Sequence, residues 1–136
     1  MENINEIIRG EPDGSVSFGD CSAQEKRKTE NFDWEGDVYK VKTYQEITKM
    51  EKNGKLLLET VPGANIKNFF ITEEKAQFGL EGADDVRVTM ELLPETLYRI
   101  VIDGNSIGNV KSNIAGKVVF SLDTEGAQKK VEVSKN

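Results

Sequence analysis

The sequence predicts an all-β fold, an antiparallel β-sandwich, and three observations support this prediction. Apolar residues alternate with polar ones along short stretches, as in strands with one buried face. Turn-forming pairs such as Asn53-Gly54 and Asp103-Gly104 separate these stretches. No helical pattern is long enough to connect two parallel strands. We therefore expect about nine to eleven short strands, arranged as an antiparallel sandwich or, as the alternative, a closed barrel.

The N-terminal third begins with an expected arm over residues 1–12. Isoleucines at helix-compatible spacing allow a short helix there, but Gly10 and Pro12 end it after about two turns. In the run over residues 13–21, Val16 and Phe18 alternate with serines between two glycines, which predicts a short strand between turns. Residues 24–28 are polar and lack a clear period, so loop, helix start and strand end all stay open for them.

Strands are expected throughout the middle of the chain. Asn53-Gly54 suits a two-residue hairpin turn, Pro62-Gly63 ends the strand that follows, and a charged turn lies at 73–75. The expected strands cover residues 37–44, 44–51, 55–61, 66–71 and 76–80.

Alternation is clearest in the last third. Pro94 interrupts ladder pairing, and Asp103-Gly104 marks a hairpin. The expected strands cover residues 86–92, 98–102, 107–111, 118–122 and 131–133. Seven side chains should share one interior: Val86, Val88, Met90, Tyr98, Ile100, Val118 and Phe120. With this single core we expect one β domain over 1–136.

The composition excludes several classes of function. Eighteen Lys and Arg against 24 Asp and Glu give a net charge of −6, which repels nucleic-acid phosphates. There is no histidine, and the single cysteine, Cys21, cannot form an internal disulfide. No apolar stretch has the length of a membrane span, and the opening residues MENINEIIRG lack the features of a secretion signal. We expect a cytoplasmic protein with no nucleic-acid or membrane partner.

The run L-P-E-T-L-Y-R-I-V-I at residues 93–102 resembles the corner before a late strand in fibronectin type III and related immunoglobulin-like sandwiches. In those domains the tyrosine ring packs inward and its hydroxyl bonds to backbone a few residues upstream. The resemblance implies structural roles for Tyr98 and Pro94. It extends over residues 83–136, whose closing hairpins are similar to those of accessory modules on carbohydrate-active enzymes.

A second resemblance covers most of the chain. The stretch G-D-V-Y-K-V-K-T-Y-Q-E-I-T-K-M-E-K-N-G, with the later E-T-V-P-G, is similar to small acidic proteins of clostridial bacteria that are sometimes labelled endosialidase. It implies a bacterial intracellular origin. No catalytic motif accompanies it that could be assigned residue by residue.

The segment D-W-E-G-D at residues 33–37 is the main candidate site. An exposed Trp34 could stack on a sugar face, although a lone tryptophan is more often a core anchor. We take Trp34, Glu35, Asp37 and Tyr39 as candidate ligand-binding residues. Asp33, Glu35 and Asp37 are candidate ligands for Ca²⁺, which prefers several oxygen atoms. Beyond this ion we expect no cofactor.

Three hypotheses on function follow. The first is a non-catalytic binding or assembly module, with a carbohydrate or a protein as partner, because catalytic histidine, nucleophile and phosphate-loop motifs are all absent from the sequence. The second is a glycan-active enzyme that uses two carboxylates. Its candidate acids are Asp20, Asp33, Glu35, Asp37, Asp84 and Asp85. The third is a structural homo-oligomer that pairs exposed strand edges.

Overall fold

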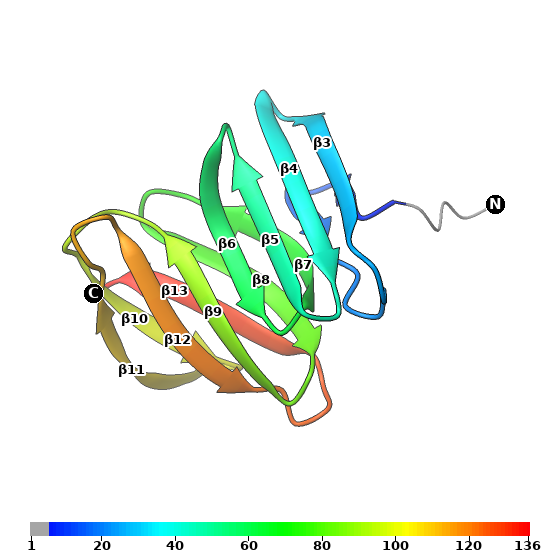
Figure 1. Ribbon diagram of the computed structural model, residues 1–136. Helices are drawn as coiled ribbons and strands as arrows, with labels where there is room; N and C mark the ends of the chain where they lie inside the picture. The colour runs from blue at the N-terminus through cyan, green and yellow to red at the C-terminus, as the bar shows by residue number, and fades with distance from the viewer. Residues whose placement is uncertain (1–5) are drawn as a thin grey trace.

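The molecule consists mainly of paired strands in which every second side chain is buried. Residues 6–136, the part of the chain that the computed structural model describes, form thirteen strands and no helix. The strands build two antiparallel sheets that face each other (Figure 1). The predicted all-β sandwich is confirmed. Over these same residues, no helix has the length and hydropathy needed to cross a membrane.

The six-stranded sheet lies in front in Figure 1, and the seven-stranded sheet lies behind it. In spatial order the front sheet contains β12 (Lys117–Asp123), β9 (Asp85–Glu91), β6 (Lys55–Val61), β5 (Ile47–Lys52), β4 (Asp37–Tyr44) and β3 (Arg27–Trp34). The rear sheet contains β1 (Ile8–Gly10), β2 (Val16–Phe18), β7 (Ala64–Ile71), β8 (Lys75–Gly82), β13 (Lys129–Lys135), β10 (Leu97–Ile102) and β11 (Asn105–Lys111). Strands β3 to β6 form a meander, after which the chain crosses repeatedly between the sheets.

The two hairpin turns predicted from the sequence are present. Asn53 and Asp103 have φ angles of 53° and 50°, and the glycine after each also has a positive φ. Both central positions of such a turn require this left-handed backbone, which asparagine, aspartate and glycine tolerate best. The local chemistry of these pairs therefore sets the register of β5 with β6 and of β10 with β11.

Two strands were not predicted. β1 forms where the sequence left a short helix or an arm open: Ile7 and Ile8 are both buried, and β1 pairs with β2. The remaining arm residues 1–5 lie outside the described part of the chain. β3 starts in the undecided segment and continues to Trp34, and an extra residue at Asn31 interrupts its alternation. These additions raise the number of strands above the expected nine to eleven.

An unbroken row of apolar side chains crosses the inner face of the front sheet. Its members pair directly, strand to strand, and each is fully buried: Val41, Met50, Leu58, Met90 and Val118. The seven residues expected to share one interior all belong to the same buried cluster, so that prediction is confirmed. Burial of this many large apolar side chains is the main source of stability in a domain of this size.

A second inner row of the same sheet is polar. Thr43, Thr48 and Thr60 pair across β4, β5 and β6, and all three are fully buried. The Thr48 hydroxyl lies 2.7 Å from that of Thr43, donates to the Ala64 carbonyl at 2.8 Å and accepts from the Ala64 N–H at 3.0 Å. Thr48 thereby ties the front sheet to β7 in the rear sheet. The Thr60 hydroxyl has no hydrogen-bond partner among residues 6–136.

Tyr98 holds the chain where it passes from β9 to β10. Its side chain is buried, and its hydroxyl oxygen accepts a hydrogen bond of 3.1 Å from the N–H of Leu93, five residues upstream. The buried Ser112 hydroxyl donates to the Leu93 carbonyl at 2.6 Å and accepts from the Thr96 N–H at 2.8 Å. Pro94 lies between these contacts, after the end of β9. The segment around Pro94 is therefore anchored from both sides.

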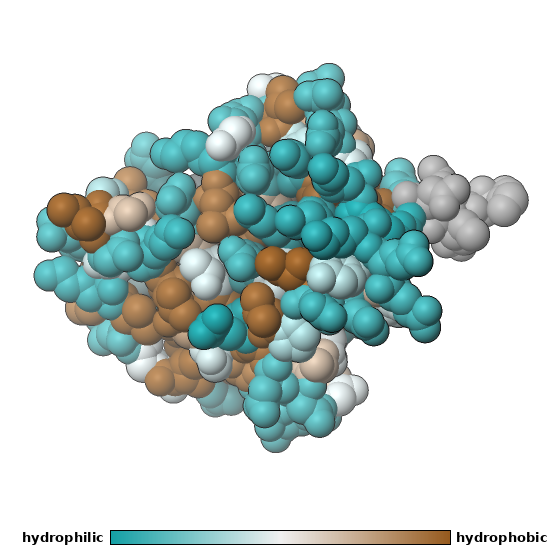
Figure 2. Space-filling view, viewed as in Figure 1, coloured by the Kyte–Doolittle hydropathy of each residue, from teal (hydrophilic) through white to brown (hydrophobic). Residues whose placement is uncertain are grey.

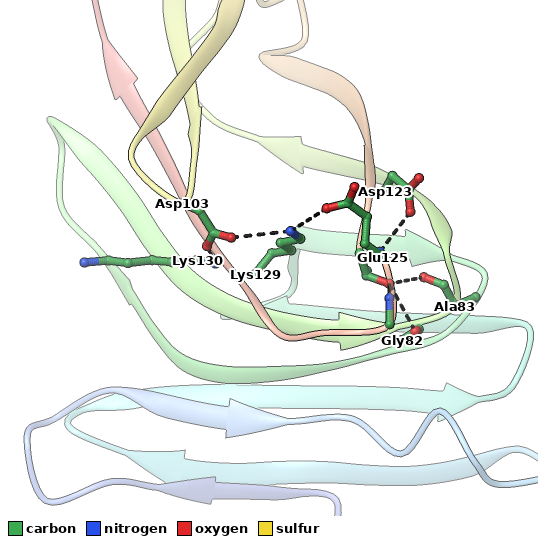
Figure 3. A network of polar contacts seen from close by, with 9 residues as sticks. Gly82, Ala83, Asp103, Asp123, Glu125, Lys129 and Lys130 are labelled. Atoms are coloured by element: carbon green, nitrogen blue, oxygen red, sulfur yellow. Dashed lines mark hydrogen bonds and ion pairs between the residues drawn. The ribbon is translucent and has the colours of Figure 1, made fainter.

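The turns at the end of the chain are joined by charged side chains (Figure 3). Lys129 lies 3.0 Å from a carboxylate oxygen of Glu125 and 3.5 Å from one of Asp103. The backbone N–H of Lys130 donates to Asp103, which lowers the pKa of that carboxyl together with the nearby charge of Lys129. These ion pairs lie at the surface, so they contribute little to stability and mainly fix the position of the turns.

The threonine row provides a test of the inner face. Thr60→Val removes an unbonded buried hydroxyl at nearly constant volume, so we expect the free energy of unfolding to rise by about 1 kcal/mol. Thr48→Val leaves the Ala64 N–H and carbonyl without their partner, so it should lower the same quantity by about 1 to 3 kcal/mol. Urea denaturation of the two variants measures both effects. Equal destabilisation by both changes would contradict this account of the row.

Candidate functional site

A groove of about 460 Å³ opens at the end of the sandwich where the β3–β4 hairpin faces β2 and β7. One wall comes from the loop between β1 and β2, the other from β4, the end of β5 and the turn between β3 and β4. The lining residues are Pro12, Asp13, Gly14, Val16, Glu35, Asp37, Tyr39, Lys52, Phe69, Phe70 and Ile71. Three of the four predicted ligand-binding residues, Glu35, Asp37 and Tyr39, thus line one cavity.

The tight turn at Glu35-Gly36 positions Glu35 and Asp37, the two acidic residues on the β3–β4 side of the groove. Glu35 and Gly36 have φ angles of 52° and 84°, and Trp34 pairs with Asp37 across the turn. Asp37 is then fixed from the neighbouring hairpin: the Asn53 side-chain amide donates to it at 2.9 Å, and the Lys52 ammonium lies 3.5 Å away. The hydrogen bond from Asn53 and the charge of Lys52 lower the pKa of Asp37, so this carboxylate is ionised at neutral pH.

Tyr39 contributes an aromatic ring and a hydroxyl to the groove. Its side chain is largely buried, and no residue within 6–136 forms a hydrogen bond with its hydroxyl. Burial and the negative charge of Asp37 raise the pKa of Tyr39, so the phenol stays neutral at physiological pH. A neutral phenol can donate and accept a hydrogen bond, and here both capacities are free for a bound molecule.

Phe70 is turned toward the surface by a β-bulge. Asn68 has a φ of 51° and adds one residue to β7, which shifts the register against both β2 and β8. The bulge reverses the alternation: Ile66 and Phe69 point inward, whereas Phe70 is 45% exposed. Bulges often redirect a side chain beside a functional site. Phe70 borders the groove, and its side chain is exposed at the surface.

Asp13 completes the polar lining from the β1–β2 loop. The N–H and hydroxyl of Ser15 both donate to Asp13, and these bonds lower the pKa of its carboxyl. Ser15 in turn accepts a hydrogen bond of 3.0 Å from the side chain of Asn68, the bulge residue. The groove therefore carries three carboxyl groups and one ammonium group, and its polar residues are linked to the bulge that exposes Phe70.

Trp34, the fourth predicted ligand-binding residue, does not line the groove. One face of its indole packs on Gly10, where any Cβ atom would overlap the ring. Its Nε1–H donates to the Gly14 carbonyl at 3.1 Å. The side chain thus holds the β1–β2 loop in place, as an anchor rather than a platform for ligand. This is the more common role of a single tryptophan in a small β-protein.

The candidate calcium ligands Asp33, Glu35 and Asp37 do not come together. Within residues 6–136, no three acidic, histidine or cysteine side chains form a group that could hold a metal ion. The bulge at Asn31 explains this result, because it turns Phe32 and Trp34 inward and leaves Asp33 exposed on the outer side. Asp37 is drawn toward Asn53 instead.

The other acidic candidates also lie away from the groove. Asp20 accepts a hydrogen bond of 2.6 Å from Arg27, and a bond from Ser22 is the main cause of its lowered pKa. Asp84 and Asp85 lie at the connection from β8 to β9. Near Asp20, burial raises the pKa of the Cys21 thiol, and the charges of Glu81 and Asp20 add to this effect. The local environment therefore disfavours a reactive thiolate.

Three charged or exposed aromatic residues of the lining, Asp13, Lys52 and Phe70, were not predicted from the sequence. One signal for Phe70 was available: adjacent aromatic residues in a strand point to opposite faces, so one of Phe69 and Phe70 had to face outward. Asp13 and Lys52 gave no such signal. Their approach to the groove depends on which strands pair, and on how the β1–β2 loop folds.

Comparison with known proteins leaves the geometry as the basis for any functional argument. No protein-family model, curated protein or solved structure matches this chain. The arrangement of acids, lysine, phenol and exposed ring in the groove is therefore interpreted by its chemistry.

The coupling of Asp37 to Tyr39 can be measured. Asp37→Asn removes a negative charge near the phenol, so the pKa of Tyr39 should fall yet stay above its ordinary value, because burial is the larger cause. Ultraviolet titration of tyrosinate, with Tyr39→Phe as the reference, gives this pKa. In the folded state the raised pKa favours the neutral phenol of Tyr39. The contribution of Tyr39 to the free energy of unfolding is therefore fully present below pH about 10 and is lost as the pH rises further.

Asp33→Asn serves as the control for this titration. It makes the same charge change on the same hairpin, but Asp33 is not a cause of the Tyr39 shift. The titration of Tyr39 should be unchanged in this variant. Equal shifts in both variants would mean that the net charge of the protein, rather than the position of Asp37, controls the phenol.

Proposed function

We propose that this protein is a non-catalytic binding module that holds a carbohydrate in the groove between the β3–β4 hairpin and β7. The observation that carries the proposal is a groove bordered by the aromatic residues Tyr39, Phe69 and Phe70 together with polar groups that can form hydrogen bonds. Saccharides present apolar C–H faces together with many hydroxyl groups, and the groove offers a partner for each.

The polar groups of the groove are suited to hydroxyl recognition. The carboxylates of Asp13, Glu35 and Asp37 can accept hydrogen bonds from sugar hydroxyls, whereas Lys52 and the Tyr39 hydroxyl can donate. The volume of about 460 Å³ falls in the range typical of small-molecule sites. A second hollow of about 410 Å³ lies near Pro94 and Ala115, but it has no aromatic lining. The groove at Phe70 is therefore the better saccharide site.

Binding without turnover is favoured by the ionisation of the groove acids. Glycoside hydrolysis needs one carboxyl with a raised pKa that can donate a proton to the leaving group. The pKa values of Asp13 and Asp37 are instead lowered by hydrogen bonds from Ser15 and Asn53. Ionised acids of this kind serve as acceptors for hydroxyl groups. The resemblance of residues 83–136 to immunoglobulin-like accessory modules agrees with a binding role.

The sheet edges favour a binding module over a self-assembling one. Natural proteins discourage pairing between edges with short strands, charges and bulges. β1 has three residues, β3 carries several charged side chains, and β12 begins and ends with charged residues. β11 has few charges but contains an extra residue, Ile107, opposite β10.

A glycan panel tests the proposal directly. We expect at least one oligosaccharide to bind saturably, with a change in Trp34 fluorescence because Trp34 holds the loop that forms one wall. Phe70→Ala removes the exposed ring, so affinity measured by calorimetry should fall about ten- to hundredfold. Ile107→Ala, which truncates a similarly exposed apolar side chain on β11, should leave affinity unchanged.

Three results would overturn this proposal. A flat response over the whole panel would exclude carbohydrate as the ligand. Equal losses in Phe70→Ala and Ile107→Ala would place binding outside the groove. Incubation of each bound oligosaccharide with the protein, followed by an assay for new reducing ends, separates the module from the hydrolase: release of reducing ends would establish the enzyme instead.

A further inference from the structure

Three lysines stand directly opposite one another on the outer face of the front sheet. Lys28 of β3 pairs with Lys42 of β4, which pairs with Lys49 of β5. Lys40 lies two residues before Lys42 and so projects from the same face of the strand. Figure 2 views this face, and hydrophilic side chains cover the part over β3 and β4. We call Lys28, Lys40, Lys42 and Lys49 the lysine row.

The lysine row is electrostatically unfavourable in the free protein. Neighbouring strands are about 4.8 Å apart, and like charges in directly opposed positions destabilise a sheet. The row is also unusual in a chain whose net charge is −6. Such a repulsive arrangement is relieved when an anion binds between the ammonium groups.

Glutamates pair with Lys28 and Lys49, and one of them, Glu51, also stands directly opposite Lys40. Glu30 lies 3.6 Å from the Lys28 ammonium, and Glu51 lies 3.9 Å from that of Lys49. Lys42, in the middle, forms no ion pair with any residue of the described chain, 6–136. The central ammonium is therefore available to a negatively charged group from solution.

The four lysines surround a small depression. Its volume is about 80 Å³, and its lining consists of the lysine row and Glu51. This space is well below the roughly 300 Å³ of a pocket for a drug-sized molecule, so it does not suit a whole sugar ring. A single tetrahedral oxyanion has suitable charge and size, since ammonium groups bind phosphate as point charges with several donors.

We propose that the lysine row is a binding site for one phosphate or sulfate group. This site is independent of the carbohydrate groove: Lys40 projects to the outside of β4, whereas the adjacent Tyr39 projects into the groove on the inner side. The charged residues of the groove are three carboxylates and one lysine, and their net negative charge repels such an anion. Failure of either proposal therefore leaves the other intact.

Nuclear magnetic resonance titration with inorganic sulfate and inorganic phosphate tests the site, with sodium chloride at matched ionic strength as reference. We expect saturable shifts at the amides of Lys28, Lys42 and Lys49 with the oxyanions and not with chloride. Lys42→Gln removes the central charge and should weaken binding about fivefold, as expected for one charge at about 4 Å in water. A third titration with a sulfated disaccharide shows whether an ester-linked group binds better than the free ion.

Lys117→Gln is the matched control. It makes the same change of charge on the outer face of the same sheet, but at β12, where Lys117 lies opposite Glu91. Its sulfate affinity should equal that of the unaltered protein. Shifts spread over all lysines, a lack of saturation, or equal weakening by both variants would overturn the proposal, because each would indicate non-specific ionic screening.

Discussion

The fold depends on one constraint: each pair of strands must place its apolar side chains on the same inner face. The row Val41, Met50, Leu58, Met90 and Val118 satisfies this requirement across five strands without a gap. A slip of one residue in any of these pairs would move buried side chains into water. The positions of the turns, the groove and the lysine row all follow from this register.

Much of the fold could be predicted from the sequence because local patterns determine it. Alternation, short apolar runs and turn signals predicted β2 and β4 to β13, and Asn53-Gly54 and Asp103-Gly104 predicted two of the turns. β3 was missed for a physical reason: the extra residue at Asn31 breaks its period of two, and its inward side chains are only partly buried. β1 is too short to show any period.

The candidate site was predictable only in part, because it combines near and distant segments. Glu35, Asp37 and Tyr39 belong to one hairpin and could be proposed together. Phe70 reaches the same groove through a bulge in the other sheet. Trp34 lies outside the groove, because its ring packs on a distant residue, Gly10. No alternation in the sequence encodes such contacts between remote segments.

The opposite faces of β4 have different electrostatic character. Its inner face supplies Asp37 and Tyr39 to the acidic groove. Its outer face supplies Lys40 and Lys42 to the lysine row. A strand can do both because its successive side chains alternate between the two faces. The same alternation that builds the core thus separates two surfaces of different charge.

The bulge at Asn68 has an evolutionary consequence. Because the extra residue lies between Ile66 and Phe69, loss of one codon at Asn68 would restore regular pairing and leave Phe69 facing inward, opposite Val16. What the deletion would remove is the pair of hydrogen bonds from Asn68 to Ser17 and Ser15. The bulge residue therefore serves the attachment of the β1–β2 loop and β2, and the apolar interior does not depend on it.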